Sequence, residues 1–171
     1  MPFVNIYFSL GSNLGDRRRN LTEAVERLEA ALDAPCAALS RFIETRAAGF
    51  SGGKFLNAAA LFRVHRPEGT TEECCRALLG TVKQIERAMG RTDPPEYDAE
   101  GRRVYHSRII DIDILFYGKE TVDAEDITVP HKGIADRPFV MIPLQEIARP
   151  SLRDAFPAFF PDPTKINPPQ I

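Results

Sequence analysis

The residues with the clearest chemical potential are two aspartates inside an apolar run, Arg108-Ile-Ile-Asp-Ile-Asp-Ile-Leu-Phe116. The run predicts a strand, and Asp111 and Asp113 stand two positions apart, so both project from the same face. Their Cα atoms are then roughly 6–7 Å apart, which is two strand rises. Two carboxylates on one face repel each other unless they are solvated, paired or bound to cations. Such a pair can hold two magnesium ions and phosphate oxygens, or it can pair with Arg and Lys on an exposed sheet face.

A second group of polar residues follows this strand. The segment Thr128-Val-Pro-His131 is followed six residues later by Arg137. Taken alone, His131 is more often a surface residue than a ligand. With Arg108, however, the segment supplies three groups suited to an anionic triphosphate, because charged donors bind phosphate oxygens strongly.

Two further segments can recognise a ligand. The loop Gly11-Ser-Asn13 can present backbone N–H groups, although an ordinary strand-to-helix turn is the more common role of such a sequence. Phe55 and Asn57 share one face of another predicted strand, where an aromatic ring and an amide can stack on and hydrogen-bond a flat heterocycle. Outward-facing polar residues on a half-exposed strand are the common alternative. The sequence has neither a Walker A motif nor a G-x-G-x-x-G loop.

The elements that must position these residues follow from hydrophobic periodicity. Asp16 is a plausible N-cap for a first helix, and Thr70-Thr-Glu-Glu73 matches the capping box of a second, which Gly90 ends. A short helix is expected near Phe139–Ile147. Alternating apolar residues predict four strands, over Phe3–Leu10, Ala37–Thr45, Phe55–Val64 and Arg108–Phe116.

The resulting β-α-β-β-α-β order predicts an α+β, ferredoxin-like fold, with an antiparallel sheet and both helices on one face. The other face and its loops are left for a site. The polar segment Arg91–Ser107 is longer than most connections, which predicts a functional loop or lid. From Ala148 the chain is proline-rich, and we expect residues 149–171 to form an extended tail. No linker or repeat divides residues 1–171, so one domain is expected.

Composition excludes several classes of protein. The formal net charge of −2 argues against a nucleic-acid-binding surface. No apolar stretch approaches the roughly 20 residues of a membrane span, and no signal peptide is visible. Cys36, Cys74 and Cys75 have neither metal-site nor disulfide spacing. Free thiols fit the cytoplasm, so we expect a cytoplasmic protein.

Taken together, the motifs resemble the 6-hydroxymethyl-7,8-dihydropterin pyrophosphokinase family over roughly residues 3–150. That family has the ferredoxin-like fold and transfers the terminal diphosphate of ATP to the pterin hydroxymethyl oxygen, releasing AMP. The resemblance therefore implies a monomer whose partners are these two small substrates. It rests on Leu10-Gly-Ser-Asn-Leu14, Glu44-Thr45, Phe55-Leu-Asn-Ala58, the aspartate strand, Thr128-Val-Pro-His131, Arg137 with Phe139, and Pro143-Leu-Gln-Glu-Ile147.

The resemblance also implies a role for each matching residue. Asp111 and Asp113 would coordinate two Mg²⁺ ions. The phosphate-contacting positions are Arg108, His131 and Arg137. Thr128 is a further ATP-binding position, and Glu86 matches a helix position near the ATP ribose. The pterin-binding positions are Thr45 and Asn57, with Phe55 and Phe139 as the aromatic pair around the ring. The loop positions are Tyr105, which closes over the site, Arg91, and either Arg102 or Arg103.

The sequence departs from the family pattern in places. The loop with Pro94-Pro95 is longer, which leaves open which arginine closes on ATP. Arg46-Ala-Ala-Gly49 replaces the prolines usual after the threonine of the second loop. Lys132 stands where an aromatic is common, and Asp126 where a basic residue is common. These differences affect peripheral phosphate contacts and leave the aspartate pair intact.

Two other functions compete with this interpretation. A different two-metal enzyme on a ferredoxin-like sheet would also place carboxylates on a strand, but it would not require Phe55, Asn57 and Phe139 around a pterin-sized slot. A non-catalytic ligand-binding module would need no strand carboxylates facing Arg and His. Pterin-dependent AMP formation separates the first alternative from the pyrophosphokinase, and binding of an ATP analogue without metal dependence would favour the second.

Overall fold

The computed structural model describes residues 2–45, 54–90, 96–97, 99–101, 103–104, 109–134 and 136–161, with only the backbone at 96–97 and 103–104. Among the helices of these residues, none combines the length and apolar character that a membrane crossing requires. The elements, in chain order, are β1 (Phe3–Ser12), α1 (Arg17–Leu32), β2 (Cys36–Leu39), β3 (Ile43–Thr45), β4 (Phe55–His65), α2 (Thr71–Ala88), β5 (Glu96–Tyr97), β6 (Arg103–Val104), β7 (Asp111–Tyr117), β8 (Val122–Asp123), β9 (Thr128–Val129), α3 (Pro138–Ile147) and α4 (Pro150–Ala155).

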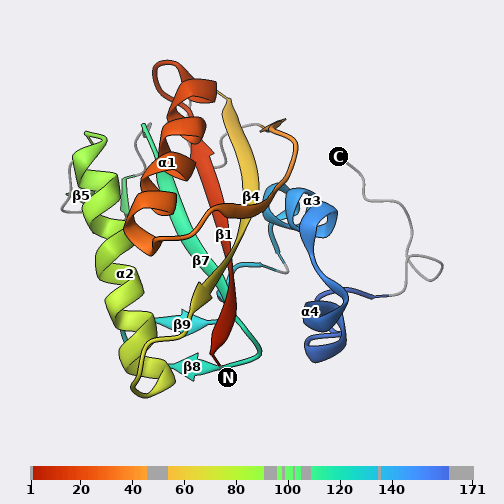
Figure 1. Cartoon of the computed structure of the whole chain (residues 1–171). Coiled ribbons are helices and arrows are strands. Elements are labelled where there is room, and N and C mark those ends of the chain that lie inside the picture. The colour runs from red at the N-terminus through yellow and green to blue at the C-terminus, as the bar shows by residue number, and fades with distance from the viewer. Residues whose placement is uncertain are drawn as a thin grey trace.

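The central sheet is antiparallel, with strand order β2-β4-β1-β7 and β3 also paired with β4. Helices α1 and α2 pack together on one face, α1 against β1 and β4 and α2 against β7 (Figure 1). The predicted ferredoxin-like fold class is therefore confirmed. Alternate residues of each strand build the core beneath these helices, for example Ile6 and Phe8 of β1.

Both predicted helix starts are confirmed. The Asp16 side chain accepts a hydrogen bond from the Arg19 N–H and caps α1. Thr70 and Glu73 form a complete capping box at α2, in which each side chain accepts a hydrogen bond from the other residue's backbone N–H. Gly90 follows α2 with φ +100°, a left-handed conformation that glycine adopts without strain.

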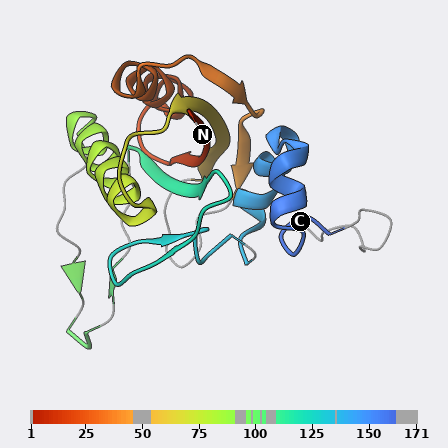
Figure 2. The same ribbon diagram turned by 60° about the horizontal axis from the view of Figure 1, so that its bottom comes forward.

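The opposite face of the sheet is partly covered. Helix α3 packs against β4 and β3, and Figure 2 shows α3 and α4 on the side of the sheet away from α1 and α2. A second core forms there around Tyr7, Phe116, Leu144 and Leu152. The expectation of an extended tail from Ala148 is wrong for the described part, because residues 150–155 form α4 and Leu152 is buried.

Strand β7 contains a bulge that the sequence pattern did not reveal. Phe8 pairs with Ile114 whereas the adjacent Tyr7 pairs with Phe116, so β7 has one extra residue at this point. As a result, Phe116 enters the second core. A regular alternation would have placed it in the first core with Ile112 and Ile114. The strand begins at Asp111, while Ile109 and Ile110 precede it without strand structure.

Two predicted boundaries are also corrected. The single strand Ala37–Thr45 is divided into β2 and β3, because the buried Ser40 hydroxyl accepts a hydrogen bond from the Ala59 N–H at 2.8 Å. That side-chain bond replaces a ladder bond and lets the chain turn away. Gly11 and Ser12 extend β1 and pair with Asn57 and Leu56, so they are not part of a loop.

Tyr7→Phe is expected to lower the free energy of unfolding by about 1 kcal/mol. The Tyr7 side chain is 1% exposed, and its hydroxyl accepts a hydrogen bond from the Arg149 N–H, which joins the sheet to the start of α4. Urea denaturation followed by circular dichroism measures the change. Phe8→Leu in the first core is a control that shows the effect of a change in side-chain volume without loss of a hydrogen bond. An unchanged urea midpoint for Tyr7→Phe would show that the hydroxyl does not stabilise this junction.

Candidate active site

The two aspartates lie at one end of the uncovered part of the sheet. Asp111 and Asp113 are both half-buried and alternate with the buried Ile112. Asp111 pairs with Gly11 and Asp113 pairs with Ser9 of the neighbouring strand. Since paired residues share a face, the carboxylates project over β1 on the side opposite α1 and α2.

A row of residues crosses the sheet from these carboxylates toward β3. Asp111, Gly11, Asn57 and Ile43 are successive cross-strand partners. Asp111 and Asn57 are therefore two strand spacings apart, roughly 10 Å. A Cβ at Gly11 would lie 3.2 Å from the Asn57 Oδ1 and 3.5 Å from the Phe55 ring. The missing side chain leaves the sheet surface open between the carboxylates and the aromatic–amide pair.

The amide of Asn57 has a fixed orientation. Its side chain is buried, and its Nδ2 donates to the Thr45 Oγ1 at 2.7 Å and to the Ile43 carbonyl at 3.4 Å. These bonds distinguish the two ends of the amide and leave Oδ1 on the Gly11 side. The structure thus brings together Thr45 and Asn57, two of the residues expected to bind a flat ring.

A network of three side chains, from Arg17, Glu44 and Lys54, holds β3 and the start of β4 together. Arg17 donates to the Lys54 carbonyl at 2.7 Å and pairs with Glu44 at 3.2 Å, while the Lys54 ammonium lies 3.4 Å from Glu44. The network fixes the start of α1 beside Thr45 and Phe55. No local pattern indicates this network, because Arg17 and Glu44 are 27 positions apart in the chain.

His131 lies beside the aspartate strand. Its backbone N–H donates to the Leu115 carbonyl at 3.1 Å, and its Nε2 is 3.7 Å from the Asp113 Oδ1. The ring Nδ1 accepts a hydrogen bond from the Gly133 N–H. The proton of the neutral ring is therefore on Nε2, the nitrogen that faces the carboxylates. Burial lowers the pKa of His131 and nearby Arg137 lowers it further, against the opposing effect of Asp111.

The His131 ring is expected to titrate below its ordinary value of 6.5. Because the folded-state pKa is lowered, the unfolded chain binds the proton more readily, and this residue reduces stability as the pH falls through 6.5. Ring carbon–proton NMR shifts measured between pH 4.5 and 8 give the pKa, with the urea-unfolded chain as the reference. A folded-state pKa above that reference would contradict the burial argument.

Arg137 and Phe139 stand at the beginning of α3. Arg137 is the exposed N-cap residue, and its guanidinium lies 6.0 Å from the centre of the Phe139 ring. It also passes so close to Gly133 that a Cβ there would be 2.7 Å from the Arg137 Nε. Thr128 lies in the short strand β9, which leads to His131. The cation and the aromatic ring are thus on one helix end, close in sequence to His131.

Glu86 lies in α2, as expected, but it makes a contact that the sequence did not indicate. Its side chain is 5% exposed, and its carboxylate accepts a hydrogen bond from the backbone N–H of Ile112 at 2.9 Å. Ile112 lies between the two aspartates on β7, the edge strand of the sheet. Glu86 therefore binds the outward N–H of an edge strand from α2. Its expected place near the ATP ribose stays a prediction.

The carboxylates of Asp111 and Asp113 are chemically suited to bind magnesium. Asp111 and Asp113 offer hard oxygen donors on one half-exposed face. Within the residues that the structure describes, no group of three or more His, Cys, Asp or Glu is arranged to hold a metal ion. Magnesium commonly binds through one or two carboxylates together with water and substrate phosphates. Two strand carboxylates open to a ligand suit that mode.

Several predicted site residues lie outside the described part of the chain. They are Arg91, Arg102, Tyr105 and Arg108, and only the backbone of Arg103 is described. Most of the predicted loop between residues 91 and 107 is likewise outside it.

Comparisons with a family profile and with individual proteins both point to one family of pyrophosphokinases. The profile of the 7,8-dihydro-6-hydroxymethylpterin-pyrophosphokinase (HPPK) family matches residues 7–149. A 2-amino-4-hydroxy-6-hydroxymethyldihydropteridine pyrophosphokinase from Porphyromonas gingivalis is 38% identical over 145 residues, 84% of this chain and 90% of that protein. The enzyme of that name from Bacillus subtilis is 32% identical over 150 residues, 87% and 81% of the two chains.

A longer relative matches equally well. The mitochondrial folate synthesis bifunctional protein of Pisum sativum is 39% identical over 142 residues. The matched region is 83% of this chain but only 25% of the pea protein. This chain thus corresponds to one part of the bifunctional protein and to most of each bacterial relative.

Proposed function

The chain belongs to the 7,8-dihydro-6-hydroxymethylpterin-pyrophosphokinase family, and we propose that it transfers the terminal diphosphate of ATP to the hydroxymethyl oxygen of 6-hydroxymethyl-7,8-dihydropterin. AMP and the pterin diphosphate are the products, on the route to folate. The observation that carries the proposal is the row Asp111–Gly11–Asn57 on one open face of the sheet.

The row Asp111–Gly11–Asn57 supports a site in which the two substrates bind side by side. Asn57 presents an oriented amide, with Thr45 beside it, at the β3–β4 side of the site. Such an amide suits the polar edge of a pterin ring, which carries both donors and acceptors. Roughly 10 Å away, two strands across, Asp111 marks the side for phosphate. A bicyclic ring with a one-carbon arm is about the right length to span Gly11 between them.

Asp111 and Asp113 would hold the magnesium ions. When bound, magnesium neutralises triphosphate charge and lowers the pKa of a coordinated hydroxyl. Because the two carboxylates lie in one strand with Ile112 buried between them, the backbone itself fixes their separation.

His131 and Arg137 supply charge stabilisation on the phosphate side. The neutral His131 ring directs its Nε2–H toward the Asp113 carboxylate, at 3.7 Å, where a phosphate oxygen could also accept it. Arg137 adds an exposed guanidinium, a group suited to phosphate oxygens. Phosphoryl transfer depends mainly on positioning and on charge stabilisation, so these groups need no covalent role. We assign no general base.

The proposal is tested by AMP release from ATP, with and without hydroxymethyl-dihydropterin, while magnesium is varied. AMP and pterin diphosphate should form in equal amounts, and only when both substrates and the metal are present. Formation of AMP without the pterin would favour a different nucleotide enzyme. Metal-independent binding of an ATP analogue without turnover would favour a ligand-binding module.

A further inference from the structure

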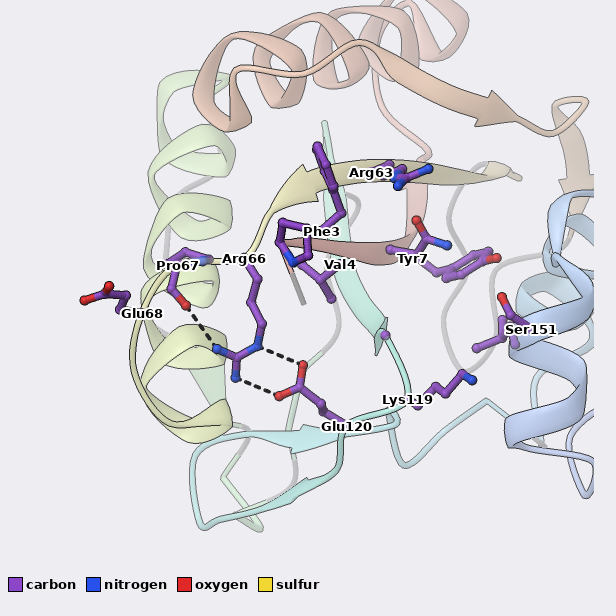
Figure 3. Close-up of a pocket in the computed structure, with 14 residues that line it drawn as sticks. Phe3, Val4, Tyr7, Arg63, Arg66, Pro67, Glu68, Lys119, Glu120 and Ser151 are labelled. Atoms are coloured by element: carbon purple, nitrogen blue, oxygen red, sulfur yellow. Dashed lines mark hydrogen bonds and ion pairs between the residues drawn. The ribbon is translucent and has the colours of Figure 1, made fainter.

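The second face of the sheet has another opening at the end away from the aspartates. A cavity of about 790 Å³ lies there, between the beginning of β1, the end of β7 and α4 (Figure 3). Its apolar lining on this face includes the buried side chains of Tyr7 and Leu152, both members of the second core. The volume lies within the range of small-molecule sites, and its mixed apolar and charged lining is typical of them.

This cavity is separate from the candidate active site. Asn5 lines the cavity and Gly11 lies between the site residues, six positions further along β1. Six strand rises correspond to roughly 20 Å. The second core, with Tyr7 and Phe116, fills the sheet face between the two openings. A ligand in the cavity would therefore not touch the aspartates.

Arg63 forms one charged wall of the cavity. Its guanidinium lies 4.6 Å from the centre of the Phe3 ring, which in turn packs against the His65 ring at 4.3 Å. The stacking holds the guanidinium in place. Arg63 makes no hydrogen bond or ion pair with any residue that the structure describes, so its donors are available to a ligand.

Lys119 supplies a second cation on the opposite wall, where Figure 3 shows its side chain extending toward Ser151. Lys119, too, has no ion pair within the described residues. The third cation, Arg66, is already paired with Glu120 through bonds of 2.7 and 3.1 Å, and this pairing holds the pKa of Glu120 below its usual value. The carboxylate of Glu68 points away from the other lining residues in Figure 3.

The remaining charge in the cavity is therefore positive and faces an apolar floor. We propose that this cleft is a second binding site, for a small molecule with an apolar body and a carboxylate or phosphate group. Arg63 and Lys119 bind the anion from opposite walls, and Tyr7 and Leu152 contact the apolar part. The inference does not depend on the reaction catalysed at the other end of the sheet.

The test uses the full chain, labelled with ¹⁵N, and three probes with the same aromatic body: 1-naphthoate, 1-naphthyl phosphate and the neutral 1-naphthamide. At least one anionic probe should produce saturable amide shifts at Asn5, Arg63 and Lys119 but none at Asp111 or Asp113. Comparing the carboxylate with the phosphate shows which anion the site prefers. The neutral probe should bind about tenfold more weakly, because each ionic contact near the surface contributes modestly.

The double variant Arg63→Gln, Lys119→Gln should lose about tenfold in affinity for the anionic probe. Lys83→Gln, an exposed charge on α2, is the matched control and should bind as the parent chain does. Pyrophosphoryl transfer by the double variant should stay within about twofold of the parent. The proposal is overturned by an absence of saturable shifts up to 10 mM probe, by equal binding of the neutral probe, or by unchanged affinity in the double variant.

Discussion

Asp111→Asn and Asp113→Asn should each lower pyrophosphoryl transfer by about 10³-fold or more, equivalent to roughly 4 kcal/mol of transition-state stabilisation. Both side chains share one face of β7, in register with Gly11 and Ser9. Asparagine keeps their size but removes the negative charge that a divalent cation requires. Initial rates of AMP formation at saturating substrates and varied magnesium measure the loss.

Asp123→Asn is the matched control for these variants. Asp123 is an exposed aspartate on β8, so its replacement changes the net charge equally without altering the proposed metal site. Its rate should equal that of the parent chain. Near-parental activity in both β7 variants would instead show that the carboxylates only pair with surface cations, the alternative that strand spacing alone left open.

Glu86→Ala should reduce both stability and activity, because the Glu86 carboxylate binds the backbone of the strand that carries the two aspartates. The substitution leaves the buried Ile112 N–H without its acceptor at 2.9 Å, which costs about 1–3 kcal/mol of folding stability. The same bond fixes the backbone between the two aspartates. Because small displacements of positioning groups can reduce rates by about 10²-fold, we expect a decrease approaching that size.

Glu86→Gln distinguishes positioning from charge, since glutamine keeps an acceptor oxygen of the same reach. It should restore most of the protection of the Ile112 amide against hydrogen exchange and most of the activity. Hydrogen exchange measured by NMR on the substrate-free protein reports the bond directly. If the Ala variant keeps parental protection at Ile112, the contact does not hold the strand and the explanation fails.

The parts of the fold that could be predicted are those governed by local patterns. The capping box at Thr70 and the N-cap at Asp16 are short-range hydrogen-bonding arrangements, and both form as expected. The alternation in β1 and β4 also places the expected residues in the first core. The division at Ser40 was missed because it depends on a bond to Ala59, nineteen positions away.

The candidate site was predictable to a similar extent. A period of two places Asp111 and Asp113 on one face, and the same period places Phe55 and Asn57 together. The bond from Ile112 to Glu86, by contrast, joins residues 26 positions apart, and a carboxylate in an amphipathic helix gives no sign of its partner. The sequence also does not show that Gly11 leaves space on the sheet surface, because that space is bounded by Phe55 and Asn57 on β4.

The extra residue in β7 uncouples the orientation of side chains at one end of that strand from their orientation at the other. Asp111 and Asp113 precede the bulge and take their register from Gly11 and Ser9, whereas Phe116 follows it and packs with the aromatic side chains that succeed α4. If the same residues ran as a regular strand without the bulge, Leu115 would pair with Tyr7 and Phe116 with Ile6. Phe116 and Tyr117 would then exchange sides, while the carboxylates would stay in place. A change of register beyond Ile114 can therefore alter the packing of Phe116 without moving Asp111 and Asp113 relative to Gly11 and Ser9.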